Sequence, residues 1–180
     1  MEVFTEEIMC PLFTILERTR GVEQRADYHP EGDVLNHSLQ TMYCAFKETI
    51  DTDLILAAMM HDVGKALEKD GHAEIAFELL QPFLSAKSLW LIRHHMRVRL
   101  FLDGHMKRKS KIDYLLENAW FTDLVLLSRF DLMGRDPNET VDLDREKITE
   151  RLNRYVDLKF EANKLRAETE DKFKEGLNKY

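Results

Sequence analysis

Residues that end helices or make tight turns are scarce in this chain, which has only seven glycines and four prolines among its 180 residues. That share is about half of the usual one, so few positions favour a turn. Leucine, a good helix former, occurs 25 times, whereas valine and isoleucine, which favour strands, together occur 16 times. Both features predict a fold built from α-helices.

Apolar residues recur at helical spacing along most of the chain, and glycines, prolines and capping residues divide it into segments. In one segment Leu35, Leu39, Met42 and Phe46 share a face, and Asp33 is placed to cap the first turn. We therefore expect a single compact all-α domain of about six to eight helices. The expected helices are residues 3–19, a helix that follows Asp33, and residues 53–61, 73–84, 86–101, 110–118, 120–132 and 143–177.

The chain shows no internal repeat, low-complexity stretch or linker rich in proline and serine, and its length suits one domain. We therefore expect residues 1–180 to form one unit without an internal boundary. The last expected helix carries many charges of both signs, with Ile148, Leu152, Tyr155 and Ala162 along one side. This pattern predicts a long charged C-terminal helix that packs on the domain by that side, and a dimerising helix is the alternative.

Several classes of protein are excluded by simple features. The longest apolar run, Leu54 to Met60, is too short to span a bilayer. The acidic start has no basic region before an apolar stretch, so we expect no signal peptide. Two cysteines, Cys10 and Cys44, are too few for a disulfide framework or a cysteine-based metal site. A net charge of −7 argues against general coating of nucleic acid. We expect a cytoplasmic protein that does not bind membranes.

The adjacent residues His61 and Asp62 are the first sign of chemistry, because they end an apolar helix. Burying an imidazole beside a carboxylate is unfavourable unless a partner such as a metal cation satisfies both. Neighbouring residues on a helix point about 100° apart, so they can reach one ion only near a helix end, which Gly64 marks. Further candidate ligands lie at the ends or inner faces of the other expected helices: His37, His72, His94, His95 and Asp131. Each alone is more typical of a structural residue, but four histidines, with His94 and His95 counted as one position, and two aspartates could together hold one or two divalent ions.

Five short strings contain most of these residues. They are YHPEGDVLNH at residues 28–37, HDVGK at 61–65, GHAE at 71–74, LIRHHM at 91–96 and FDLMGR at 130–135. Together they resemble the HD superfamily of metal-dependent phosphohydrolases, whose fold is all-helical, and they are similar to the HD domain of bacterial CCA-adding tRNA nucleotidyltransferases. The resemblance covers about residues 10–137 and leaves residues 141–180 as a C-terminal helical extension. The head domain that carries nucleotidyltransferase activity is not part of it.

The resemblance implies a ligand set. Four residues would hold the principal metal ion: His37, His61, Asp62 and Asp131. His72 and His95 would hold a second ion, with Asp62 bridging, or would contact the phosphate directly. The family's spacing favours His95 over His94 as the ligand. Imidazole and carboxylate ligands together suit Mn²⁺, Fe²⁺, Co²⁺, Ni²⁺ or Zn²⁺ and are less typical of Mg²⁺.

The activity that the resemblance implies is hydrolysis of a phosphate ester by metal-activated water, with a nucleotide or a cyclic phosphodiester as substrate. Asp62 and Lys65 are the expected catalytic residues, the lysine by placing its charge on the phosphate. Two alternatives remain open. Some HD relatives use two irons as oxygenases, and a module without catalysis could use the same cleft to bind a nucleotide or RNA.

The charge distribution favours an anionic substrate. Residues 93–111 carry seven basic side chains and one acidic one, so this segment is +6 while the rest of the chain is −13. Such a patch would attract phosphates if it lined the cleft, and a solvated basic face is the alternative. The expected substrate-binding residues are Lys65, His94, Arg97 and Arg135. The expected partner is a small phosphorylated molecule; binding of nucleic acid is not required, and the protein could be a monomer or a homodimer.

Overall fold

The computed structural model describes residues 3–177, and side chains as far as residue 170. This part of the chain forms eight α-helices and one short 3₁₀-helix and contains no β-strand, which confirms the all-α class. None of the helices described combines the length and apolar composition needed to cross a bilayer. The elements are α1 (Glu6–Glu17), α2 (Val34–Glu48), α3 (Thr52–Met60), η1 (Val63–Ala66), α4 (His72–Leu80), α5 (Ala86–Leu102), α6 (Lys109–Leu116), α7 (Phe121–Met133) and α8 (Arg145–Leu177).

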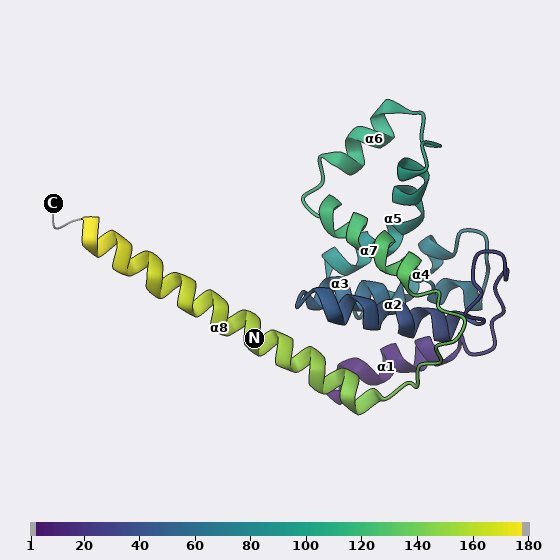
Figure 1. Cartoon of the computed structure of the whole chain (residues 1–180), viewed down its shortest axis with the longest axis horizontal. Helices are drawn as coiled ribbons and strands as arrows, with labels where there is room; N and C mark the ends of the chain where they lie inside the picture. The colour runs from purple at the N-terminus through teal and green to yellow at the C-terminus, as the bar shows by residue number, and fades with distance from the viewer. Residues whose placement is uncertain (1–2, 178–180) are drawn as a thin grey trace.

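Helix α3 lies at the centre of the core, as its almost entirely apolar sequence predicts. Every residue from Leu54 to Met60 is buried, and α3 packs against α2, α5 and α7 (Figure 1). The Asp51 side chain caps its first turn by accepting hydrogen bonds from the backbone N–H groups of Asp53 and Leu54. Helix α4 packs against both α5 and η1. The chain that follows α3 is therefore folded back onto the body of the domain.

The largest difference between an expected and an observed helix end is in α4. The helix expected over residues 73–84 ends at Leu80. Pro82 has no N–H group with which to continue the helical hydrogen bonds. The next two amides, of Phe83 and Leu84, instead both donate to the carbonyl oxygen of Leu80, at 2.9 and 3.1 Å. A tight turn therefore replaces the last helical turn and leads into α5.

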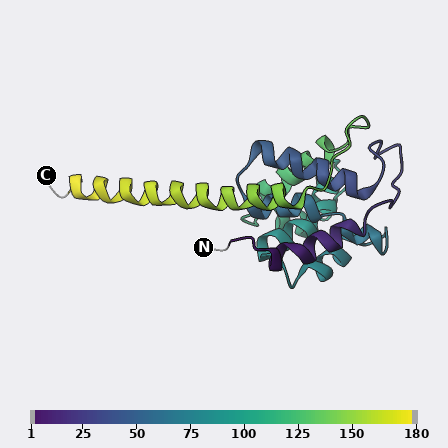
Figure 2. The ribbon, with the colours of Figure 1, turned by 90° about the horizontal axis from the view of Figure 1, so that it is seen from below.

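Helix α8 confirms the long charged C-terminal helix, but only its first turns pack on the body (Figures 1 and 2). Ile148 and Leu152 are buried, and the Tyr155 hydroxyl donates a hydrogen bond to a carbonyl of α2. Residues 157–170 are all exposed, so the prediction that Ala162 packs on the domain is wrong. The physical reason is the length of the helix. Its 33 residues span about 50 Å, so it extends beyond the surface of the domain.

Candidate metal centre

Six buried side chains from different elements gather on one side of the core. They are His37 from α2, His61 from the end of α3, Asp62 at the start of η1, His72 from the start of α4, His95 from α5 and Asp131 from the end of α7. Residues that are up to 94 positions apart in the sequence are thus brought together by the packing of the helices around α3. They are the six metal ligands predicted above, and their role as ligands stays a prediction.

Two glycines allow the elements around these side chains to approach closely. A Cβ atom on Gly64 would collide with the backbone carbonyl of His72, so only glycine lets η1 lie against the start of α4. A Cβ atom on Gly134 would collide with Thr41 in the same way. The end of α7 can therefore contact α2. This contact brings Asp131 to His37, with Oδ1 of the aspartate 3.2 Å from Nε2 of the histidine.

Asp62 lies at the centre of the group, and its two oxygens face different histidines. Oδ1 is 3.1 Å from Nε2 of His72 and 3.5 Å from Nε2 of His95. Oδ2 is 3.4 Å from Nε2 of His61 and 3.7 Å from Nε2 of His37. Four ring nitrogens of the same type thus face one carboxylate, two on each side. The carboxylate could therefore act together with histidines on either of its sides.

The orientation of the four histidine rings is fixed by contacts of their Nδ1 atoms. The Nδ1 atom of each ring lies within hydrogen-bond distance of a backbone carbonyl oxygen: 3.0 Å from Ala58 for His61, 2.8 Å from Lys69 for His72, 2.7 Å from Ile92 for His95 and 3.0 Å from Gly134 for His37. An Nδ1–H donated to a carbonyl leaves the lone pair on Nε2. Metal-binding histidines are held in this way, because the backbone bond selects the tautomer and aims the other nitrogen.

Five of the six candidate ligands form two groups of donor atoms that could hold a metal ion, and the two groups share Asp62. One group is His37, His61 and Asp62, and the other is Asp62, His72 and His95, with the donor atoms of each within 4.8 Å of one another. The Nε2 atoms of His37 and His61 are fully buried and lack a well-aligned hydrogen-bond partner among the described residues. An unsatisfied buried nitrogen is unfavourable, and a cation satisfies it. Both donor sets therefore suit a divalent ion.

Two basic side chains contact the carboxylates. Lys65 Nζ lies 2.6 Å from Oδ2 of Asp62 and also donates to the Gln24 side chain at 2.7 Å. Arg135 donates from Nη2 to Oδ1 of Asp131 at 2.6 Å and from Nη1 to the carbonyl oxygen of Tyr28 at 2.8 Å. Each cation lies at the rim of the group and is only partly buried.

The carboxyl groups of the centre are ionised. Burial acts to raise the pKa of Asp62, but its close contacts with the surrounding histidines, His61 foremost, hold that pKa well below its ordinary value. Burial likewise opposes ionisation of Asp131, and its close contact with Nε2 of His37 outweighs burial and lowers the pKa of the aspartate. Acceptors with this charge are what a divalent cation needs.

The histidines differ in their proton affinity. Burial acts to lower the pKa of His37, but its contacts with Asp131 and Glu31, together with the charge of Asp62, raise that pKa to about 9. Burial lowers the pKa of His95, which is therefore neutral at pH 7. Binding of an ion would have to displace a proton from His37, whereas the Nε2 lone pair of His95 is already free to bind it.

The neighbouring residues His94 and His95 lie in different surroundings. His95 faces Asp62, whereas the ring of His94 stacks on Trp90, with centroids 4.6 Å apart, and lies 5.5 Å from the ring of Tyr114. Nδ1 of His94 is 2.8 Å from the Trp90 carbonyl oxygen, and the side chain is buried. The structure therefore does not bring His94 to the centre with Lys65 and Arg135. Arg97, the fourth predicted substrate-binding residue, is exposed further along α5.

Glu31 is a buried carboxylate beside the centre that the sequence analysis missed. Its Oε1 atom lies 2.7 Å from Nδ1 of His37 and 2.9 Å from Nδ1 of His29. Burial acts to raise its pKa, but the hydrogen bonds from both histidines lower it to about 2. A glutamate between a proline and a glycine is typical of an exposed turn. No pattern in the sequence indicated that this one is buried behind a candidate ligand.

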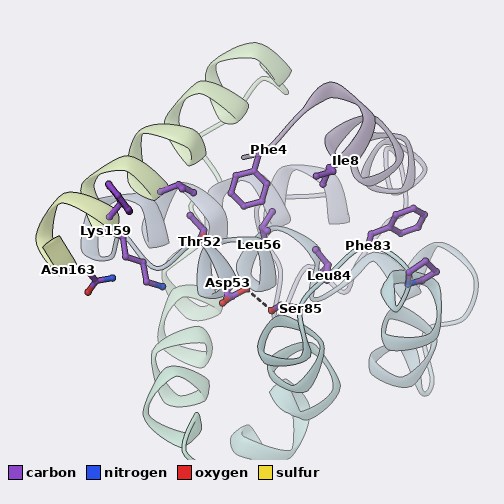
Figure 3. A pocket seen from close by; sticks show the side chains of 13 residues that line it. Phe4, Ile8, Thr52, Asp53, Leu56, Phe83, Leu84, Ser85, Lys159 and Asn163 are labelled. Carbon is purple, nitrogen blue, oxygen red and sulfur yellow. Dashed lines mark hydrogen bonds between the residues drawn. The ribbon is translucent and has the colours of Figure 1, made fainter. Parts of the chain in front are cut away.

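Cavity size alone does not locate this centre. A cavity of about 590 Å³ lies between α1, α3, α8 and the turn from α4 to α5 (Figure 3). Phe4, Leu56 and Phe83 line it, and the Ser85 hydroxyl donates to Asp53 Oδ1 at 2.6 Å along its wall. None of the six candidate ligands lines it. A smaller cavity of about 230 Å³ is lined by Lys65 and therefore adjoins the centre.

Comparison with known proteins gives matches over the same region. Residues 34–116 match the family model of the HD domain. The chain is 30% identical over 139 residues to the multifunctional CCA protein of Laribacter hongkongensis, an alignment that covers 66% of this chain and 34% of that protein. The protein of the same description from Burkholderia multivorans is 39% identical over 69 residues, covering 34% of this chain and 17% of the relative. The one from Acinetobacter baumannii is 41% identical over 56 residues, covering 31% and 14%. The chain thus spans about a third or less of the length of these relatives.

Proposed function

We propose that this protein hydrolyses a phosphate ester with one or two bound divalent metal ions. The proposal starts from the match of residues 34–116 to the HD domain, which is the domain of a superfamily of metal-dependent phosphohydrolases. The observation that supports this most strongly is the orientation of the four histidines. Each Nδ1 is occupied by a backbone carbonyl, and each Nε2 faces Asp62. Histidines that serve only packing have no need to converge on one carboxylate.

The residues divide between two ions in the way the distances suggest. His37, His61 and Asp62 would hold one ion together with Asp131, whose Oδ1 is 3.2 Å from Nε2 of His37. Two more residues would complete the site for a second ion, with Asp62 shared: His72 and His95. The mixed nitrogen and oxygen donors suit Mn²⁺, Fe²⁺, Co²⁺, Ni²⁺ or Zn²⁺ better than Mg²⁺. Such an ion polarises a phosphoryl oxygen and lowers the pKa of water toward 7.

In this proposal two basic side chains, Lys65 and Arg135, bind the phosphate. Lys65 is held between Asp62 and Gln24, so its ammonium group is placed to donate a hydrogen bond to a phosphoryl oxygen. The guanidinium of Arg135 is held by Asp131 and by a backbone carbonyl, which fixes its direction. Charge that develops on the phosphate in the transition state would thus meet two positioned donors. Asp62 would help to hold both ions, and it positions the lysine.

A metal analysis followed by a substrate panel tests this proposal. The purified full chain is analysed for bound metal, then assayed with Mn²⁺, Fe²⁺, Co²⁺, Ni²⁺, Zn²⁺ and Mg²⁺ against nucleoside monophosphates, 2′,3′-cyclic nucleotides and simple phosphate esters. We expect hydrolysis that a chelator abolishes and that a transition metal restores better than Mg²⁺. Aerobic binding of two irons with a mixed-valence EPR signal and no hydrolysis would contradict the proposal and favour an oxygenase.

A further inference from the structure

The part of α8 that leaves the body, residues 157–170, is helical although its side chains are all exposed (Figures 1 and 2). Helices in water owe most of their stability to the packing of one face against other elements. Among the side chains that the structure describes in this stretch, one ion pair lies within the helix, between Arg166 and Glu170 at 2.9 Å. An exposed pair of this kind contributes little. We call residues 157–170 the free half of α8, and a partner that covered one of its faces would stabilise it.

The cavity of about 590 Å³ lies where α8 leaves the body, between α8 and the turn from α4 to α5 (Figure 3). The apolar side chains of Phe4 and Leu56 lie between these two walls. Phe83 on the turn is 38% exposed and Phe160 on α8 is 56% exposed, and both line the cavity. Exposed apolar surface that is gathered in one place is typical of an interaction site.

One face of α8 forms a wall of this cavity and continues into the free half. Val156, Phe160 and Asn163 line the cavity, and Ala167 follows on the same face. Successive members of this set are four, three and four residues apart, which is the spacing of helices that pair along a narrow seam. We call these four residues the seam. The seam and the apolar cavity beside it thus offer a surface that fits another helix.

The charges beside the seam favour an antiparallel helix of the same sequence as the partner. Asp157 and Lys164 lie on one flank of the seam, two helical turns apart. In an antiparallel pair whose seams meet at their centres, Asp157 lies beside Lys164 of the second copy, and the two-fold symmetry repeats this ion pair. A shift by one heptad in either direction would oppose two aspartates or two lysines. A parallel pair would oppose Lys159 to Lys164.

The other flank of the seam is basic and turns toward the body. It carries Lys159 and Arg166, so the antiparallel pair places Arg166 of the second copy beside Lys159. Lys159 lines the cavity together with Asp53. The carboxylate of Asp53 supplies opposite charge on this side, so the wall of the cavity offsets the repulsion between the two basic groups.

We propose that the cavity receives the free half of α8 from a second copy of this chain, so that two chains form an antiparallel dimer through their seams. Each copy then supplies both a cavity and a helix, as a two-fold interface requires. Phe160 of each copy lies near the two-fold axis, where buried aromatic residues contribute most to binding. The inference does not depend on the proposed function, because none of the six candidate ligands lines the cavity.

The opposite side of α8 provides a matched control. It also carries exposed apolar residues, Leu158 at 39% and Leu165 at 65%. The cavity on that side, of about 510 Å³, is lined by six residues of α8, and four of them are charged. A helix bound there would cover charged groups without reaching the apolar residues of the body.

Sedimentation velocity of the purified full chain over a wide range of concentration tests the dimer. We expect the mass of two chains at high concentration and dissociation on dilution. Phe160→Asp should raise the dissociation constant of the dimer at least about thirtyfold, because it places a charge at the centre of the interface. Leu165→Asp makes the same kind of change on the opposite side of the helix and should leave the dissociation constant unchanged. Circular dichroism checks that each variant keeps its helices.

Exchange of the flanking charges tests the antiparallel arrangement. Asp157→Lys and Lys164→Asp should each raise the dissociation constant about tenfold, because each variant alone opposes like charges at two symmetric places. The double variant re-forms both ion pairs with the charges exchanged, so it should restore the affinity. A merely structural role of either side chain within its own helix would not give this restoration.

Three outcomes would overturn the inference. The first is a monomer at every concentration. The second is a dimer that Leu165→Asp dissociates and Phe160→Asp does not, because the opposite side of α8 would then form the contact. The third is a double charge variant that binds no more tightly than the single ones, because the two flanks would then not meet.

Discussion

Helix α5 joins two regions that look alike in sequence and differ in structure. Its middle carries His95, which is buried against Asp62 with its Nδ1 held by a backbone carbonyl. The segment from Arg97 to Lys111 carries most of the positive charge of residues 93–111, and the basic side chains at both its ends are exposed. Both regions suggested phosphate chemistry in the sequence. Only the first contains ionisable groups that are buried and positioned.

The difference shows how strongly buried and exposed ionisable residues each indicate a functional site. A buried imidazole or carboxylate is unfavourable unless its surroundings satisfy it, so its presence in the core demands an explanation. An exposed arginine or lysine is well solvated and contributes little to stability wherever it lies, so its position needs no special explanation. We therefore assign the chemistry to the centre around Asp62 and only weak attraction to the tip formed by the end of α5 and the start of α6. The following predictions test that division.

The largest effect is expected for Asp62→Ala. Asp62 faces all four histidines, so its loss should remove bound metal and lower turnover at least about a thousandfold. Asp113→Ala, on α6, is the matched control in the other region and should retain both. Metal content by mass spectrometry, turnover and circular dichroism are measured together. A folded Asp62→Ala protein with full metal content and turnover would contradict the assignment.

The second prediction concerns pH. The pKa of His37 is about 9 in the folded protein against 6.5 when unfolded, so its contribution to stability is fully present below pH 6.5 and is lost as the pH rises toward 9. With a chelator present, the free energy of unfolding should fall by on the order of 3 kcal/mol over this range. A metal ion binds His37 only in its neutral form. The affinity of the protein for the metal should therefore rise with pH.

Urea unfolding at pH 6.5 and pH 9 measures this. His37→Gln should flatten the dependence in chelator, whereas replacing the exposed His105 by glutamine should leave it unchanged. Equal stability at both pH values in the chelated, unaltered protein would show that His37 does not carry the raised pKa.

A third, smaller effect is expected for Glu31→Gln. The carboxylate of Glu31 accepts from Nδ1 of His37 and strengthens its Nε2 as a ligand, so the neutral amide should lower metal affinity about tenfold. Glu48→Gln is the control, since Glu48 pairs with Arg129 on the surface. Metal affinity from competition with a chelating dye is the measurement. Unchanged affinity in Glu31→Gln would mean that the Gly134 carbonyl alone holds His37.

The smallest effect is expected at the α5–α6 tip. Neutralising Arg97, Lys107, Arg108 and Lys109 should raise KM about threefold, leave kcat and metal content unchanged, and flatten the dependence of kcat/KM on salt. These side chains are exposed, so they act at a distance and about equally on substrate and transition state. A large fall in kcat would contradict this division between the two regions, because it would mean that residues of the tip take part in the reaction.

The sequence allowed the fold class and most helices to be predicted for physical reasons, whereas the set of six candidate ligands came from the resemblance to the HD superfamily and stays a prediction. Helical spacing and scarce glycine report on local structure, and the pair His61–Asp62 at a helix end reports on an unusual buried charge. Glu31 and Gln24 could not be found in this way, because their burial depends on how the loop of residues 18–33 folds against α2 and η1. The prediction that Ala162 packs on the domain was wrong for the same reason. Its side of the helix is apolar, but the surface of the domain ends before the helix reaches this residue.

The account rests on one claim, that the Nε2 atoms of the four histidines bind the metal. Nitrogen NMR of the imidazole rings during titration of the full chain with diamagnetic Zn²⁺ tests it directly. We expect the Nε2 signals of four rings to shift while their Nδ1–H signals persist: His37, His61, His72 and His95. The signals of His94, which is stacked on Trp90, and of the exposed His105 should not move. Shifts at Nδ1, or shifts confined to His94 and His105, would contradict the claim.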